Sequence, residues 1–277
     1  MSEVLVDVEG RTVRLTNLQK VLYPDGFTKG QVIDYYMRIA PVLLPHLRDR
    51  TLTRLRCPDG VDGEQFFEKN APRGKPDWVR TETVGGVAYV VVDDLASLAW
   101  TANLAALELH THQWRIGSES PFLLVLDLDP GPPASVVECC QVALLARDHL
   151  LGLGVEPFVK TSGSKGLQVL ARAPVEDTSS FARVLAEGLE AAHPELVVSR
   201  MTKAVRPGKV FLDWSQNNPA KTTVAPYSLR ARARPTVSTP ITWDEVEACT
   251  DLEDLAFTAD QVLERVEQHG DLMLSLL

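Results

Sequence analysis

The chain has 277 residues, of which 45% are hydrophobic, and its formal net charge is −9. This length is enough for one large domain or for two closely packed lobes with a substantial core. The sequence has no apolar run of about 18 residues and no apolar signal-peptide core at its N-terminus. We therefore expect no membrane partner, and we predict a cytoplasmic location.

The acidic residues are concentrated at the C-terminal end of the chain. Residues 242–277 contain ten acidic residues and one basic residue, Arg265, so the other 241 residues contain 27 of each kind. Local basic clusters decide nucleic-acid binding more than the total charge does. The negative net charge therefore does not exclude a nucleic-acid partner.

The predicted elements alternate between strands and helices along the whole chain. The first half is expected to form a hairpin over 4–13, a helix over 29–39 capped by Thr28, strands over 51–56, 65–70 and 87–92, and a helix over 97–110. The second half is expected to form helices over 135–151 and 179–192, strands at 158–160 and 210–214, and an acidic helix from 243 onward.

The four cysteines, Cys57, Cys139, Cys140 and Cys249, show no metal-ligand spacing. We predict free, buried thiols in a reducing compartment. Cys139 and Cys140 are neighbours in a predicted helix, so at most one of them is expected to face the core.

Lys20 and Lys29 flank a Pro-Asp-Gly turn before the first predicted helix. Both side chains can converge on one anion near the start of that helix. The alternative is a pair of solvated surface lysines.

Adjacent aromatic residues on a strand point in opposite directions, so one of Phe66 and Phe67 is expected in the core. The other can be an exposed platform on which a nucleic-acid base stacks. Taken alone, the pair predicts that both residues are in the core. His110, at the end of the predicted helix, is a core residue unless the fold brings it to a catalytic group.

The most informative stretch is Phe-Leu-Leu-Val-Leu-Asp-Leu-Asp-Pro-Gly, at 122–131. Its apolar residues predict a strand buried on both faces. Asp127 and Asp129 then share one face at the strand end, where Pro130 and Gly131 stop the pairing. Two adjacent carboxylates repel each other unless a cation intervenes, and oxygen ligands of this kind suit Mg²⁺ or Mn²⁺. The alternative is that these residues cap a helix or turn.

Three further segments carry groups that suit metal or phosphate chemistry. The turn at 160–169, Lys-Thr-Ser-Gly-Ser-Lys-Gly-Leu-Gln-Val, has the glycines, hydroxyls and lysines of a phosphate cradle, although a flexible hairpin also explains it. Asp213 ends a second apolar strand and supplies the third carboxylate that a two-metal site needs. Arg230 and Arg232 lie two positions apart, which suits a triphosphate or a nucleic-acid backbone.

In their order along residues 15–245, these motifs resemble the primase-polymerase domain of bacterial ATP-dependent ligase D, in the archaeo-eukaryotic primase superfamily. The motifs that carry the resemblance are Thr-Asn-x-x-Lys-Val-Leu-Tyr-Pro, Phe-Phe-x-Lys, Glu-Leu-His, Asp-Leu-Asp-Pro-Gly, Lys-Thr-Ser-Gly-Ser-Lys-Gly-Leu, Asp-Trp-Ser-Gln-Asn and Lys-Thr-Thr-Val-Ala-Pro-Tyr-Ser-Leu-Arg-Ala-Arg.

The resemblance implies an α/β fold with mixed sheets, the archaeo-eukaryotic primase fold, in one primase-polymerase domain over 1–277. We expect an N-terminal lobe over about 1–120 with the 5′-phosphate and template contacts. A catalytic, RNA-recognition-like lobe is expected over about 121–241, and an acidic helical support over 242–277. The active site is expected between the lobes.

The same resemblance implies the site residues. The metal triad is Asp127, Asp129 and Asp213. The nucleotide contacts are His110, Ser162, Lys165, Gln216, Arg230 and Arg232. The 5′-phosphate contacts are Asn17, Lys20 and Lys29, and the template contacts are Phe66, Phe67 and Lys69.

The implied activity is template-dependent nucleotidyl transfer with two Mn²⁺ or Mg²⁺ ions. It prefers ribonucleotides and fills short 5′-phosphorylated gaps during break or excision repair. The implied partners are gapped or broken DNA, a nucleoside triphosphate, a DNA ligase and a Ku-type end-binding protein, which places the chain at the nucleoid. Met1 and the acidic end favour a free-standing, actinobacterial-type homologue.

The sequence departs from the family pattern at two places. Gln168 stands where the family usually has His, and Glu-Lys-Asn at 68–70 stands where the family more often has Gln-Lys-His. A neutral amide can bond a phosphate but carries no charge. The alternative function is a non-catalytic module that bridges DNA ends or binds a 5′-phosphate. A phosphatase with Asp127 as its nucleophile is disfavoured, because Pro130 and Gly131 follow the motif instead of the Thr which that chemistry needs.

Overall fold

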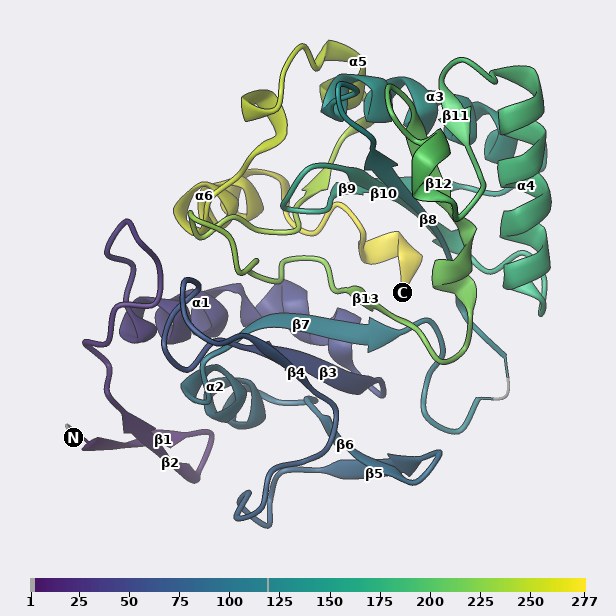
Figure 1. Ribbon diagram of the computed structural model, residues 1–277. Coiled ribbons are helices and arrows are strands. Elements are labelled where there is room, and N and C mark those ends of the chain that lie inside the picture. Colours follow the sequence, from purple (N-terminus) through teal and green to yellow (C-terminus); the bar gives the residue numbers. More distant parts are fainter. Residues whose placement is uncertain (1–2, 119) are drawn as a thin grey trace. The chain divides into compact units, whose positions relative to one another are not determined.

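The computed structural model describes residues 3–118 and 120–277 (Figure 1). The chain divides into two compact units. Unit 1 contains the chain up to His112 with 224–237 and 258–270, and unit 2 contains 113–223, 238–257 and 271–277. Both units are discontinuous in sequence, whereas the sequence predicted continuous lobes. Segments assigned to the catalytic lobe and to the C-terminal support therefore pack within unit 1.

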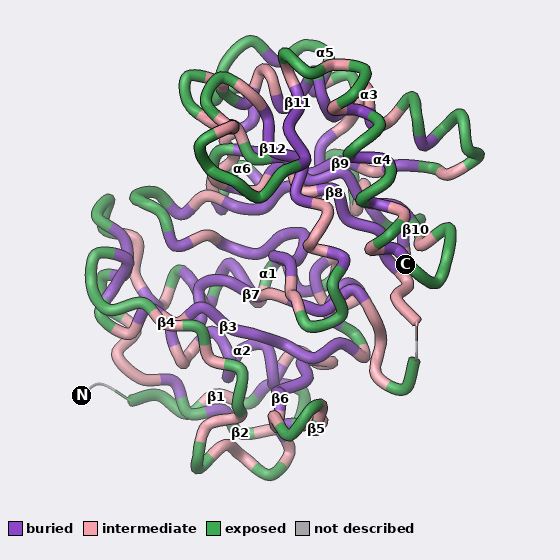
Figure 2. Tube along the Cα trace, turned by 45° about the vertical axis from the view of Figure 1, so that its right-hand side comes forward, coloured by how far each residue is buried: buried purple, intermediate pink, exposed green. Residues whose placement is uncertain are grey.

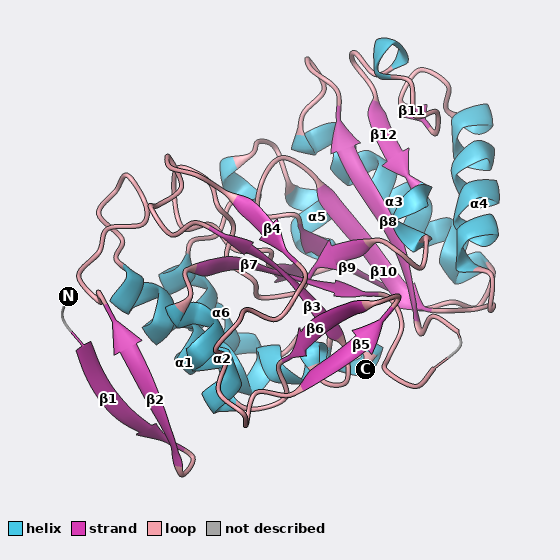
Figure 3. Ribbon diagram, turned by 60° about the horizontal axis from the view of Figure 1, so that its bottom comes forward, coloured by secondary structure: helices cyan, strands magenta, loops and turns pink. Residues whose placement is uncertain are grey.

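In its described residues, unit 1 combines a hairpin, a sheet of antiparallel strands and three α-helices. Its strands are β1 (Glu3–Val8), β2 (Arg11–Thr16), β3 (Thr51–Arg56), β4 (Phe66–Glu68), β5 (Thr81–Val84), β6 (Val87–Val91) and β7 (Ala106–His112). Its helices are α1 (Lys29–Leu47), α2 (Leu95–Asn103) and α6 (Ala259–His269). Within its sheet the order is β7-β3-β6-β5, and β4 pairs with β3. The predicted hairpin is confirmed as β1 and β2, which form a separate two-stranded ribbon (Figure 3).

Helix α1 begins at the predicted N-cap, because Thr28 and Gln31 form a capping box. It runs to Leu47, however, well beyond the predicted end near residue 39. Pro41 and Pro45 lie inside it and remove backbone donors, which normally disfavours a helix. The buried face continues through Leu43 and Leu47, so tertiary packing offsets that cost.

The predicted helix over 97–110 is wrong in its second half. Helix α2 ends at Asn103, and Ala105 has a φ of +55°, a left-handed conformation that a right-handed helix cannot include. The following residues form β7, which pairs with β3 so that His110 faces Thr53. Pairing with a distant strand thus overrides the local helical pattern.

Unit 2 is built around one six-stranded sheet with the order β11-β12-β8-β10-β9-β14. Its strands are β8 (Leu123–Pro130), β9 (Pro157–Thr161), β10 (Leu167–Arg172), β11 (Val197–Val198), β12 (Val210–Asp213) and β14 (Pro240–Ile241). Its helices are α3 (Val136–Gly152), α4 (Thr178–Ala192) and α5 (Trp243–Ala248), and β13 (Thr222–Val224) lies where the chain returns to unit 1. The predicted helices at 135–151 and 179–192 are confirmed.

The core of unit 2 lies between one face of this sheet and the helices that cover it. Leu124, Leu126 and Leu128 alternate along β8 toward α3 and α4. On the opposite face, Leu123 and Val125 pack with Leu170, Met273 and Leu276. Both faces of β8 and β10 are therefore covered over most of their length (Figure 2).

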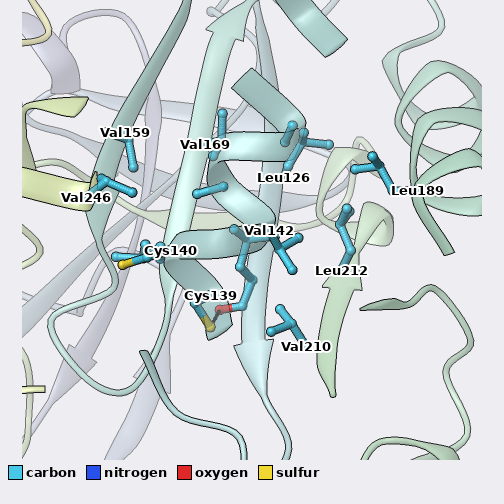
Figure 4. Close-up of a cluster of buried hydrophobic side chains, with 14 of the residues drawn as sticks. Leu126, Cys139, Cys140, Val142, Val159, Val169, Leu189, Val210, Leu212 and Val246 are labelled. Atoms are coloured by element: carbon cyan, nitrogen blue, oxygen red, sulfur yellow. Dashed lines mark hydrogen bonds between the residues drawn. The ribbon is translucent and has the colours of Figure 1, made fainter. Parts of the chain in front are cut away.

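All four cysteines are free and buried, as predicted. The expectation that only one of Cys139 and Cys140 faces the core is wrong. Cys139 Sγ lies 3.5 Å from the Leu128 carbonyl oxygen, and Cys140 packs in the same cluster as Cys249. Helix α3 is enclosed on two sides, by the sheet and by α5, so both thiols are buried (Figure 4).

The acidic end forms two helices instead of the single predicted one. Helix α5 ends at Ala248, and a 3₁₀ turn (η3, Glu253–Leu255) separates it from α6. None of the helices among the described residues has the length and apolar character needed to cross a membrane.

Candidate active site

The carboxylates of the Asp-x-Asp motif lie on the face of the unit 2 sheet that is turned away from α3 and α4. Asp127 and Asp129 alternate with Leu126 and Leu128, which point into the core. The third predicted carboxylate is next to them, because Asp213 on β12 is the cross-strand partner of Asp127. Two antiparallel strands thus bring together residues that lie 86 positions apart in the chain.

This arrangement is electrostatically unfavourable without a cation. Burial, followed by the charge of Asp129, raises the pKa of Asp127 to about 7, and Asp213 adds to the shift. The hydrogen bond from Gln168 and the positive charge of Lys160 oppose it. A divalent cation would relieve the repulsion, and the oxygen donors are those that Mg²⁺ and Mn²⁺ prefer.

Asp213 also caps the turn that follows it. Its Oδ1 accepts hydrogen bonds from the Ser215 backbone N–H at 2.9 Å and from the Ser215 hydroxyl at 2.5 Å. Its Oδ2 faces Gln216 Nε2 at 3.3 Å and Lys221 Nζ at 3.7 Å. As these side chains stand, no three His, Cys, Asp or Glu residues in the described parts of the chain are arranged to hold one ion. The donor chemistry fits a divalent cation, and Asp213 would have to exchange partners to join the set.

The turn after β9 packs closely on the end of β8. Ser162 Oγ accepts hydrogen bonds from the backbone N–H groups of Ser164 at 3.2 Å and Gly166 at 3.1 Å. A Cβ atom on Gly166 would lie 2.0 Å from the Leu128 carbonyl oxygen, so only glycine allows this approach. Lys165 is exposed. The turn therefore holds Ser162 and Lys165 at the end of the strand that carries the carboxylates.

A second polar cluster lies in unit 1, around Glu108. Its Oε2 accepts a hydrogen bond from His110 Nε2 at 2.8 Å, and its Oε1 accepts from Arg230 Nε at 3.1 Å. The Ala231 backbone N–H also donates to Oε1, at 3.0 Å. Burial alone would raise the pKa of Glu108, but His110 and Arg230 outweigh it and lower the pKa to about 2. Two of the predicted nucleotide contacts are thus brought together, and the nearby Arg232 is exposed.

No role was predicted for Glu108 from the sequence. The signal was the Glu-x-His spacing, which places both side chains on one face of a strand. With this segment predicted as a helix, the spacing indicated no contact, because residues two apart in a helix do not face each other.

Lys29, one of the predicted 5′-phosphate contacts, is a buried ammonium group, so for this residue the alternative of a solvated surface lysine is wrong. Its Nζ donates to the Thr16 carbonyl oxygen at 2.7 Å and to the Thr16 hydroxyl at 3.2 Å, and only 6% of the residue is exposed. Burial and the charges of Lys20 and Arg56 lower the pKa of Lys29 to about 8. Lys20 itself is exposed and pairs with Asp59 at 2.6 Å. Asn17 adopts a left-handed conformation with a φ of +54° in the segment that leads to Lys20.

The two adjacent phenylalanines differ in exposure, as expected for neighbours on a strand. Phe67 is 61% exposed, and its ring meets the His110 ring edge to face at 5.4 Å. Phe66 is half-buried beneath the guanidinium of Arg56, 5.4 Å from the ring centre. Lys69 is exposed beyond the end of β4. Phe67 therefore offers an open aromatic face, and the prediction that both phenylalanines are in the core is wrong for it.

Comparison with known proteins relates the chain to one family. A family model described as "LigD, primase-polymerase domain" matches residues 28–273. The multifunctional non-homologous end joining protein LigD of Mycolicibacterium smegmatis is 46% identical over 95% of the chain, which covers 36% of that protein. The bifunctional LigD of Bacillus subtilis is 33% identical over 93% of the chain, which covers 43% of that protein. The chain thus spans roughly a third to two fifths of the length of these relatives.

A solved structure gives the same relationship in three dimensions. The polymerase domain of Mycobacterium tuberculosis ligase D, in complex with DNA, matches with a TM-score of 0.89 and 42% identity. The match covers 95% of the chain and 97% of that domain. The predicted mixed α/β fold is therefore confirmed.

Proposed function

Because the chain belongs to the LigD primase-polymerase domain family, we propose that it fills short 5′-phosphorylated gaps in DNA with ribonucleotides during end joining or excision repair. The family is one of nucleotidyltransferases, and the chain is such a domain. The observation that carries the proposal is the pairing of Asp213 with Asp127 on the face that also holds Asp129. Three carboxylates on adjacent strand ends are what a two-metal polymerase requires.

Membership of this family implies dependence on a divalent metal. When bound by Asp127, Asp129 and Asp213, Mn²⁺ or Mg²⁺ would lower the pKa of the primer 3′-hydroxyl and neutralise the triphosphate. The protein's own part is to keep the three carboxylates together despite their repulsion. Gln168 and Lys160 favour the charged form of Asp127, which is the form that ligates a cation.

We propose six residues as nucleotide contacts. In unit 2, Ser162 and Lys165 lie on the turn beside β8, and Gln216 faces Asp213. In unit 1, His110 and Arg230 are oriented by Glu108, and Arg232 follows on the same segment. Their proposed work is to align the phosphates and the sugar, which is mainly positioning and electrostatics. A group that bonds the 2′-hydroxyl would account for a preference for ribonucleotides.

The DNA contacts proposed for unit 1 are of two kinds. Lys29, with Lys20 and Asn17, would bind the 5′-phosphate across the gap, which the buried ammonium group and its positively charged neighbours support. Phe66, Phe67 and Lys69 would contact the template, with Phe67 offering the exposed ring. The proposed partners are a DNA ligase and a Ku-type end-binding protein, and the proposed location is the cytoplasm, at the nucleoid.

Primer extension across a short gap tests this function. The full chain would be given Mn²⁺ or Mg²⁺, ribo- or deoxyribonucleotides, and gaps with or without a 5′-phosphate. We expect ribonucleotide incorporation that rises with the 5′-phosphate and is abolished by Asp127→Ala without loss of DNA binding. If the parent incorporates nothing with either metal but still bridges DNA ends, the chain is a binding module and the polymerase proposal is wrong.

A further inference from the structure

A row of polar side chains crosses the unit 2 sheet beside the carboxylates. In the strand register, Lys160 on β9 faces Gln168 on β10. Gln168 in turn faces Asp127 on β8, and Asp127 faces Asp213 on β12. Cross-strand partners point to the same side of a sheet. The row therefore runs from a cation, through a neutral amide, to two carboxylates.

The hydrogen bonds along this row have a fixed direction. Lys160 Nζ can only donate, and it donates to Gln168 Oε1. The amide nitrogen of Gln168 must then face the other way, where it donates to Asp127 Oδ1 at 2.9 Å. Rotating the amide by half a turn would point its N–H groups at the ammonium group and its oxygen at the carboxylate, so both contacts would become repulsive.

Burial makes this arrangement hard to disturb. Lys160 is fully buried and Gln168 is 5% exposed. Lys160 Nζ also donates to Ser238 Oγ at 2.5 Å, and that hydroxyl donates to the Thr161 carbonyl oxygen at 2.9 Å. A buried ammonium group held by several acceptors is costly to displace. The cation is thus anchored on the far side of Gln168 from the carboxylates.

We propose that Lys160 and Gln168 are positioning residues for nucleotidyl transfer. Lys160 sets the orientation of the Gln168 amide, and Gln168 holds Asp127 Oδ1 so that this carboxylate keeps the position in which it ligates the divalent cation. Partners of this kind, one shell beyond a metal, orient its ligands and tune its affinity. The inference rests on the proposed function, because it assigns Asp127 to metal binding.

The test is a titration of the full chain with Mn²⁺ in the absence of DNA and nucleotide. The electron paramagnetic resonance signal of free Mn²⁺ measures how much of the ion is bound. We expect Gln168→Met to weaken Mn²⁺ binding roughly tenfold or more. Gln168→His should restore binding to within about threefold of the parent, since imidazole can accept from Lys160 and donate to Asp127. Gln141→Met, on the exposed side of α3, is the matched control and should change nothing.

A double-mutant cycle separates the role of Lys160 from its direct repulsion of a metal ion. That repulsion is the same whether or not Gln168 is present, whereas the orienting effect needs the amide. Lys160→Met should therefore change Mn²⁺ affinity by factors that differ at least about threefold between the parent and the Gln168→Met background. Equal factors, or parent-like binding by Gln168→Met, would overturn the proposal.

The two proposals can fail separately, because Mn²⁺ binding is measured without catalysis. If the parent binds Mn²⁺ with an affinity that depends on Gln168 but incorporates no nucleotide, the polymerase proposal is refuted and the positioning role stands. If the parent polymerises but Gln168→Met binds Mn²⁺ as tightly as the parent, the positioning role is refuted and the polymerase proposal stands. Thermal unfolding of each variant shows whether it is folded. If Lys160→Met does not fold, the comparison of Gln168→Met with Gln168→His still decides whether Gln168 positions Asp127.

Discussion

Glu108 Oε2 and His110 Nε2 are 2.8 Å apart on the same side of β7, and the other carboxylate oxygen of Glu108 accepts from Arg230 Nε. One buried carboxylate therefore orients two side chains that come from segments 120 residues apart in the sequence. Its own charge is stabilised in return, which is why the pKa of Glu108 falls to about 2.

This pKa predicts how acid affects stability. The pKa of Glu108 is lower in the folded state than the usual 4.5, so its contribution to stability is fully present above pH 4.5. That contribution, up to about 3 kcal/mol, is lost as the pH falls from 4.5 toward 2. Glu108→Gln should therefore be less stable than the parent at pH 7, and its stability should depend less on pH below 4.5.

Urea unfolding at several pH values measures this difference. Glu264→Gln, an exposed carboxylate on α6, is the control and should follow the parent curve. If Glu108→Gln follows it as well, Glu108 is not the stabilised carboxylate that its contacts indicate.

The part of the site that sequence predicts best is the part that depends on local alternation. Asp127 and Asp129 share a face because any strand places residues two apart on one side, and an apolar run is enough to identify the strand. The contacts that the sequence does not predict depend on strand register. Gln168 faces both Lys160 and Asp127 only because β10 lies between β9 and β8, and no local pattern contains that order.

The same reasoning explains the misassigned helix. Leu107 and Leu109, two positions apart, fit a strand, but they directly continue an apolar stretch that fits a helix, and the left-handed Ala105 that ends α2 has no side-chain signature. Only pairing with β3 decides between the two. The error concealed Glu108, the residue that holds His110 and Arg230 in place.

Gly166 gives a prediction based on packing alone. Because a Cβ atom there would lie 2.0 Å from the Leu128 carbonyl oxygen, Gly166→Ala must push the turn away from β8. We expect a loss of about 1–3 kcal/mol in unfolding free energy, as for other overpacked sites, and a large loss of nucleotide incorporation. Gly188→Ala is the control: it is an exposed helix position with nothing within 4 Å, and it should gain about 0.5–1 kcal/mol. A Gly166→Ala variant as stable as the parent would mean that the turn is not packed as described.

The buried ammonium group of Lys29 predicts how alkaline pH affects stability. Its pKa in the folded state, about 8, lies below the unfolded value of 10.5. Below pH 8 the group is charged in both states and the cost of burial is fully present; between pH 8 and 10.5 the unfolded state binds more protons, so stability rises with pH. Lys29→Met should remove this rise, which urea unfolding at pH 7 and pH 10 would detect.

The same variant tests the proposed role of Lys29 in DNA binding. Loss of a charged hydrogen bond to phosphate should weaken binding to a 5′-phosphorylated gap roughly tenfold, with little effect on a gap that ends in a 5′-hydroxyl. Lys203→Met, an exposed lysine of unit 2, should not distinguish the two ends. If Lys29→Met loses the same affinity for both kinds of gap, Lys29 stabilises the fold and does not contact the phosphate.

The two phenylalanines of β4 should respond differently to substitution. Phe67 is 61% exposed, so Phe67→Ala should change unfolding free energy by less than about 0.5 kcal/mol. It should nevertheless weaken binding to single-stranded template by about 1–3 kcal/mol, the value of a base stacked on an aromatic ring. Phe66 is half-buried under Arg56, so Phe66→Ala should lose both packing and the cation–π contact and unfold at a lower denaturant concentration. Fluorescence anisotropy with a labelled template strand gives the affinities. If Phe67→Ala binds template like the parent while losing stability, its ring serves the contact with His110 instead of the nucleic acid.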